Sequence, residues 1–173
     1  MNANNMHPQP PATQRWRDGR VIWTFADGGR GSAGYKGQVG DCVTRAIAIA
    51  TEQPYQAVYD TLNTLARRER VGVRKTRISS ARLGVYRDTA HKYLLSLGWT
   101  WTPTMKIGQG CQVHLRPEEL PAGRLVVNLS KHFSAVIDGV IYDLYDSSRD
   151  GTRCVYGYWH DPRTLPTNSG GLR

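Results

Sequence analysis

The dipeptide Asp138-Gly139 lies between two runs rich in β-branched and aromatic residues, Phe133–Ile137 and Val140–Tyr145. A two-residue turn of type I′ requires positive φ at both central positions, and Asp-Gly is one of the pairs that adopts it readily. The dipeptide therefore predicts a β-hairpin in which Ile137 faces Val140.

This register decides which polar side chains of the hairpin share a face. Ser134 is expected opposite Asp143, and His132 opposite Tyr145. Because side chains alternate along a strand, Asp143 falls diagonally beside His132 and within its reach. Asp146 points to the opposite face, and it becomes the candidate partner of His132 if the turn is longer or bulged by one residue.

Apolar spacing divides the chain into a helical part followed by strands. The pattern predicts helices over 42–51, with Asp41 near the N-cap, over 54–67, and from Asp88 or Thr89 to 97. It predicts strands at 21–25, 124–129 and 154–159 in addition to the hairpin. This order indicates an α+β fold, with N-terminal helices packed on a C-terminal antiparallel sheet.

Length and composition favour one globular domain. The chain has 173 residues, of which 39% are hydrophobic, enough for a single core. Residues 1–14 are polar with three prolines and are expected to form a disordered arm, followed by the domain over 15–165 and a flexible tail over 166–173. Since no apolar run of about 18 residues occurs, we expect no membrane span and a cytoplasmic location.

The three cysteines, Cys42, Cys111 and Cys154, are an odd number at wide spacings. They show neither the short paired spacing typical of zinc sites nor the dense framework typical of disulfide-rich domains. This favours free thiols in a reducing compartment, with no metal and no cofactor. Cys111 is expected to be structural or incidental, and Cys154 to lie in a buried strand.

Positive charge is concentrated in one segment. Residues 67–92 hold nine lysines and arginines against two acidic residues, in a chain of net charge +9. Such a segment raises the local potential and predicts an acidic protein partner or nucleic acid, unless it is only a solvated loop. It also leaves a non-enzymatic binding module as the alternative function.

Cys42, His132 and Asp143 together supply the groups that cysteine hydrolysis needs. A thiol attacks best as a thiolate, which a helix N-terminus and a nearby imidazolium both stabilise, while a carboxylate orients the imidazole. The developing oxyanion needs hydrogen-bond donors. The backbone N–H of Cys42 is one, and the side-chain amide of Gln38, on a glycine-flanked loop four residues earlier, is the other candidate.

The run Gln38-Val-Gly-Asp-Cys42-Val-Thr-Arg-Ala, followed by Lys131-His132-Phe and then Asp143, resembles the Gln, Cys, His, Asp order of papain-like cysteine peptidases. Its Asp-Cys-x-x-Arg-Ala core is similar to the cysteine helix of ovarian-tumour-type deubiquitinases, and the whole chain also looks like small proteins carried by bacteriophages. The resemblance implies a papain-like fold, with Cys42 as nucleophile, His132 as base, Asp143 as the orienting carboxylate and Gln38 as oxyanion donor. It also implies cleavage of a peptide or isopeptide bond in a protein or peptide substrate; transfer to an amine, as in transglutaminases, uses the same groups.

Overall fold

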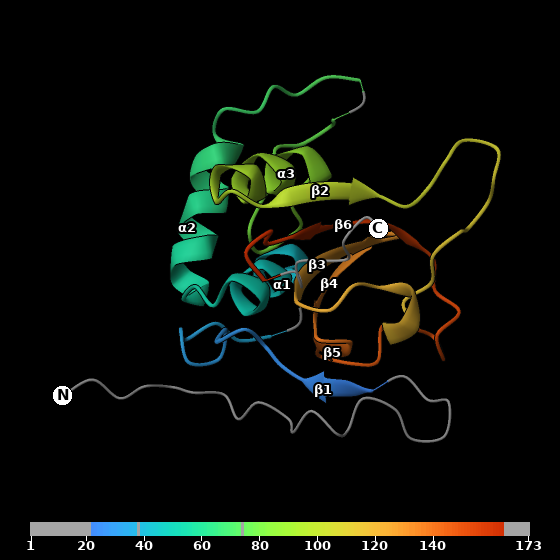
Figure 1. Cartoon of the computed structure of the whole chain (residues 1–173). Helices are drawn as coiled ribbons and strands as arrows, with labels where there is room; N and C mark the ends of the chain where they lie inside the picture. The colour runs from blue at the N-terminus through green and yellow to red at the C-terminus, as the bar shows by residue number, and fades with distance from the viewer. Residues whose placement is uncertain (1–21, 38, 74, 165–173) are drawn as a thin grey trace.

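The structure, a computed structural model, describes residues 22–37, 39–73 and 75–164, which form an α+β fold of three α-helices beside a six-stranded sheet (Figure 1). None of these helices is long and apolar enough to cross a membrane. The arm expected over 1–14 and the tail expected over 166–173 lie outside the described residues. The elements are β1 (Trp23–Phe25), α1 (Cys42–Thr51), α2 (Tyr55–Ala66), α3 (Arg87–Ser96), β2 (Thr100–Pro103), a 3₁₀ turn (Pro117–Glu119), β3 (Arg124–Leu129), β4 (His132–Ile137), β5 (Val140–Asp143) and β6 (Val155–His160).

The sheet is mixed, with the strand order β1-β5-β4-β3-β6-β2. The edge strand β1 runs parallel to β5, whereas the other neighbouring strands are antiparallel. The expected C-terminal antiparallel sheet is confirmed for the strands after α3, and β1 adds a parallel edge strand that makes the whole sheet mixed. β1 precedes the three helices in the chain, and local composition does not indicate the direction in which such a distant strand pairs.

The expected hairpin is confirmed at β4 and β5. Asp138 and Gly139 have φ values of 48° and 81°, as a type I′ turn requires. Ile137 faces Val140, and the register continues without a bulge to the pair Ala135 and Tyr142. The face occupied by each hairpin side chain therefore follows directly from the turn.

We expect Gly139→Ala to destabilise the fold more than an ordinary left-handed glycine would. A side chain at positive φ costs about 1–2 kcal/mol, and a Cβ at Gly139 would also lie 2.9 Å from Cβ of Pro117. Gly34→Ala is the matched control, because Gly34 has φ of +85° with no heavy atom within 4 Å of the added Cβ. Urea unfolding of both variants checks this; equal losses of unfolding free energy would contradict a tight contact at Pro117.

The helices form where apolar spacing placed them, and α1 begins at Cys42 as expected. α3 begins at Arg87, so that Asp88 lies in its first turn and neither Asp88 nor Thr89 is the N-cap. Asp41 does occupy the N-cap position of α1, yet its side chain makes no capping hydrogen bond. Its carboxylate instead accepts hydrogen bonds from the side chains of Arg45 and Tyr55.

The sheet has an apolar layer on each face. α1 packs on the face that carries Phe133 and Ala135, with α2 outside it (Figure 1). The other face carries Val127 and Val136 and is closed by Leu115 and Leu120 from the segment before β3. β4 is therefore buried along its whole length, which fixes the position of every side chain on it.

Cys111 and Cys154 form a disulfide, with their Cα atoms 5.7 Å apart. The expectation of free thiols is wrong for these two residues, and Cys154 is a partly buried residue just before β6 rather than a buried strand residue. The argument for a reducing compartment falls with it, because disulfides persist mainly in oxidising surroundings. The two residues are 43 positions apart, so only the folded sheet brings them together. Cys42 is a free cysteine.

Candidate active site

The sheet opens between β4 and β5 at the end remote from the hairpin turn. Their ladder joins residues 135–137 to 140–142, so the first three residues of β4 have no partner on β5. Backbone groups of alternate residues in an antiparallel ladder point at the neighbouring strand. Ala135 and Ile137 on β4 lie opposite Tyr142 and Val140 on β5, and the backbone groups of these residues point at the partner strand. Phe133 is two residues before Ala135, so its backbone groups point in the same direction. Its N–H therefore points into the opening.

Cys42 places its thiol in this opening, as the first residue of α1. His132 and the Phe133 N–H lie close enough to the thiol to stabilise its anion as hydrogen-bond donors. Burial alone would raise the pKa of Cys42, but the hydrogen bond and charge of His132, with the Phe133 N–H, outweigh burial and lower the pKa. The positive charge of Arg45 lowers it further. The thiolate is thus favoured by several independent groups.

His132 links this thiol to a carboxylate. Its Nε2 lies 2.7 Å from Oδ2 of Asp143, and the residue is 8% exposed. Burial would lower the pKa of His132, but the hydrogen bonds and negative charges of Asp143 and Cys42 raise it to about 9. The raised pKa favours a protonated imidazole at neutral pH, and since Nε2 is taken up by Asp143, Nδ1 is the nitrogen available to Cys42. The ring of Tyr145, itself about half exposed, lies 5.4 Å from the His132 ring.

Asp143 is held by four hydrogen bonds. Oδ2 accepts from His132 and, at 3.0 Å, from the Ser134 hydroxyl. Oδ1 accepts from Nη1 of Arg45 at 3.0 Å and from the Leu144 N–H at 2.8 Å. Burial would raise the pKa of Asp143, but its hydrogen bonds and the neighbouring positive charges lower it. An ionised carboxylate with all lone pairs engaged fixes the orientation of the imidazole.

The structure places Asp143, and not Asp146, against His132. Oδ1 of Asp146 accepts hydrogen bonds from the N–H and hydroxyl of Ser148, at 2.9 and 2.6 Å, within the turn after β5. The structure thus brings Cys42, His132 and Asp143 together. Gln38 lies outside the described residues, so its expected place as an oxyanion donor stays a prediction.

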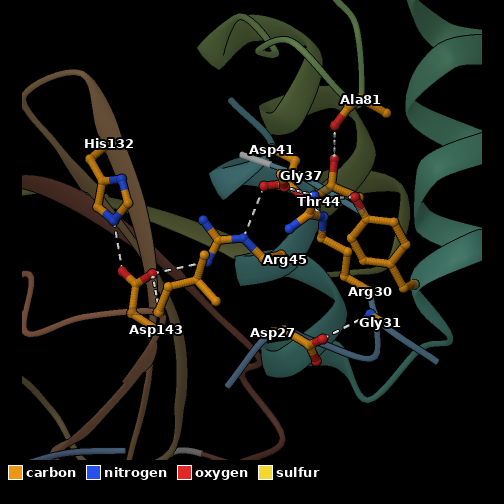
Figure 2. A network of polar contacts seen from close by, with 12 residues as sticks. Asp27, Arg30, Gly31, Gly37, Asp41, Thr44, Arg45, Ala81, His132 and Asp143 are labelled. Carbon is orange, nitrogen blue, oxygen red and sulfur yellow. Dashed lines mark hydrogen bonds and ion pairs between the residues drawn. The ribbon is translucent and has the colours of Figure 1, made fainter. Parts of the chain in front are cut away.

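Arg45 is a functional candidate that the sequence analysis missed. It is 5% exposed on α1, and it bridges Asp143 to Asp41, whose Oδ1 lies 3.0 Å from Nε of Arg45 (Figure 2). Oδ2 of Asp41 accepts from the Tyr55 hydroxyl at 2.7 Å and lies 3.2 Å from Nε of Arg30. The available signal was an arginine on an apolar helix, four residues after an aspartate.

Charges of opposite sign alternate along this network. The order is Arg30, Asp41, Arg45, Asp143, His132 and Cys42, with each member beside a group of opposite charge. Every buried charge thereby has a compensating neighbour, which is the condition under which buried ions are tolerated. The network joins the first turn of α1 to the open end of the sheet, and thus fixes Cys42 relative to His132.

Two other features do not contribute to this site. A cavity of about 250 Å³ lies at the opposite, C-terminal end of α1, lined in part by Ala50, Trp99 and Arg124. Among the described residues, no group of three or more His, Cys, Asp or Glu side chains is arranged to hold a metal ion. The groups that the structure brings together at the opening are the thiol of Cys42, the imidazole of His132 and the carboxylate of Asp143.

In comparisons with known proteins, no family model, curated protein or solved structure matches the chain.

Proposed function

We propose that the protein is a cysteine hydrolase of the papain-like kind that cleaves a peptide or isopeptide bond through an acyl-enzyme. The observation that supports the proposal is the placement of the Cys42 thiol beside His132, whose Nε2 lies 2.7 Å from Oδ2 of Asp143. A helix N-terminus beneath the thiol adds to it, because the partial positive charge there favours the thiolate.

The resting ion pair determines the order of proton transfers. The Cys42 thiolate attacks the carbonyl carbon, forming a C–S bond and moving an electron pair to the carbonyl oxygen. When the C–N bond breaks, His132 gives its Nδ1 proton to the leaving amine. Neutral His132 then takes a proton from the attacking water, the C–S bond breaks, and the thiolate and imidazolium are restored. An amine in place of water gives transfer by the same route.

The oxyanion is stabilised by the N-terminus of α1 in this proposal. The Asp41 side chain makes no capping hydrogen bond, so its carboxylate does not take up the first backbone N–H groups of the helix. Gln38, four residues before Cys42, is proposed as the second donor.

The first test measures Cys42 reactivity and needs no substrate. We expect iodoacetamide to alkylate folded Cys42 with an apparent pKa below the ordinary value of about 8.5, because His132 and the Phe133 N–H stabilise the thiolate. The rate is followed by mass spectrometry from pH 5 to 10, and the same chain in urea with its disulfide intact is the reference. Identical pH profiles for the folded and unfolded chains would rule out an activated nucleophile.

A peptide mixture then tests turnover. We expect new termini to appear with the wild-type protein and not with Cys42→Ala, together with a mass adduct of the acyl group on Cys42. Cleavage that persists in Cys42→Ala would contradict the assigned nucleophile.

A further inference from the structure

Residues 77–84, here called the basic wall, pack against the chain on both sides of Cys42. The Thr44 hydroxyl donates to the Ala81 carbonyl at 2.7 Å. On the other side, a Cβ added at Gly40 would lie 2.9 Å from the Leu83 carbonyl oxygen. Since two residues span at most about 7 Å, the basic wall stands on the order of 10 Å from the nucleophile.

The basic wall is anchored to the helices rather than free in solvent. The Ala81 N–H donates to the Asn63 side chain at 3.0 Å, and the Ser79 N–H donates to Glu69 at 2.7 Å. Ser79 and Ala81 are both buried. The view of the whole 67–92 segment as a solvated loop is therefore wrong for this part, and the charges on it have defined positions.

Three cations at the basic wall have no acidic partner among the residues that the structure describes. Arg77 Nη1 donates to the Gly84 carbonyl at 3.3 Å, and Arg82 Nη2 donates to the carbonyl of the exposed Lys36 at 3.2 Å. Carbonyls orient these guanidinium groups without neutralising them. Within the described ranges, no carboxylate oxygen lies within 4.0 Å of the charged nitrogens of Lys36, Arg77 or Arg82.

We propose that Lys36, Arg77 and Arg82 select peptide substrates that carry Asp or Glu within a few residues of the scissile carbonyl. This inference rests on the proposed hydrolase function, because it assigns the substrate class of the same nucleophile. An extended peptide advances about 3.3 Å per residue, so a side chain two or three residues from the reacting carbonyl reaches the basic wall. Positive charge there favours acidic side chains by direct attraction.

An acidic peptide fits this arrangement better than a nucleic acid does. Both are attracted to a basic surface, but only the peptide supplies an amide carbonyl that the neighbouring thiolate can attack to form an acyl-enzyme. An acidic peptide is thus a single ligand that would engage both the cations of the basic wall and the Cys42 thiolate.

The first experiment compares a charged and a neutral alkylating reagent at Cys42. We expect Arg77→Gln/Arg82→Gln to lower the ratio of the iodoacetate rate to the iodoacetamide rate about two- to fourfold at low ionic strength. The variant removes two positive charges that attract the anionic reagent, and the effect should be smaller in 0.5 M salt because salt screens this attraction. Lys92→Gln/Lys106→Gln is the matched control, because it removes the same charge from exposed residues on α3 and after β2. β2 lies three strands from β4, and the control ratio is expected to stay unchanged.

The second experiment measures protection of Cys42 from iodoacetamide by peptide pools with two fixed Glu, Gln or Lys residues. We expect the Glu pool to protect best, and its advantage to disappear in Arg77→Gln/Arg82→Gln. An unchanged reagent ratio in that variant, or equal protection by all pools, would overturn the proposal. Protection by a DNA oligonucleotide but not by the Glu pool would overturn it in favour of nucleic-acid binding. A folded Cys42 no more reactive than the unfolded thiol would instead refute the hydrolase function, and the inference with it.

Discussion

His132→Ala is expected to raise the pKa of Cys42 and to slow its alkylation at pH 6 by roughly tenfold or more. The variant removes the hydrogen bond and positive charge that lower this pKa, and burial, which raises it, remains. An ordinary thiol with a pKa of about 8.5 is less than about 1% thiolate at pH 6. A more basic thiolate is also more nucleophilic, and this offsets part of the loss and sets the estimate at tenfold rather than a hundredfold.

The direction of the pH dependence follows from the same pair. His132, with a pKa of about 9, keeps its proton through neutral pH, so wild-type Cys42 stays reactive well below pH 8. In His132→Ala the rate should instead rise steeply towards alkaline pH. His114→Ala is the control, because that ring pairs with Glu119 outside the site. If the two variants share one pH profile, the thiolate does not depend on His132.

The hairpin shows what local sequence can determine. Two residues, Asp138 and Gly139, fix the turn, the turn fixes the register, and strand alternation then places Asp143 beside His132. The Cys42 helix was also predictable, because its apolar spacing repeats over ten residues. These features depend only on neighbours in the chain.

The features that were missed depend on contacts between distant segments. The parallel pairing of β1 with β5 and the disulfide between Cys111 and Cys154 join residues whose proximity arises only in the finished sheet. Arg45 lies 98 positions from Asp143, so neither its burial nor its role as a bridge was visible in its own helix. Polar groups buried by tertiary structure are the part of a site that local patterns describe least.

Arg45→Met is expected to lower the free energy of unfolding at pH 7 by about 3–5 kcal/mol, the usual cost of removing one partner from a buried ion pair. It leaves Asp41 and Asp143, each 1% exposed, without the guanidinium that lies between them. Urea unfolding measures the loss. Arg68→Gln, at an exposed position after α2, is the control and should change stability by less than about 0.5 kcal/mol.

Two further measurements separate the role of the Arg45 charge from that of packing. Arg45→Lys keeps the charge but not the fork that reaches both carboxylates, so its loss should be intermediate. In the wild type Asp143 has a lowered pKa, and its contribution to stability is present above the unfolded pKa of about 3.9 and is lost as pH falls through the folded value. Without Arg45, one of the groups that lower that pKa is lost, so the pKa of Asp143 is higher than in the wild type and the carboxyl group takes up its proton at higher pH. The deficit of Arg45→Met must therefore shrink as the solution is acidified. A deficit independent of pH would mean that Arg45 acts through packing of its side chain, and that Asp143 does not need the guanidinium to stay ionised.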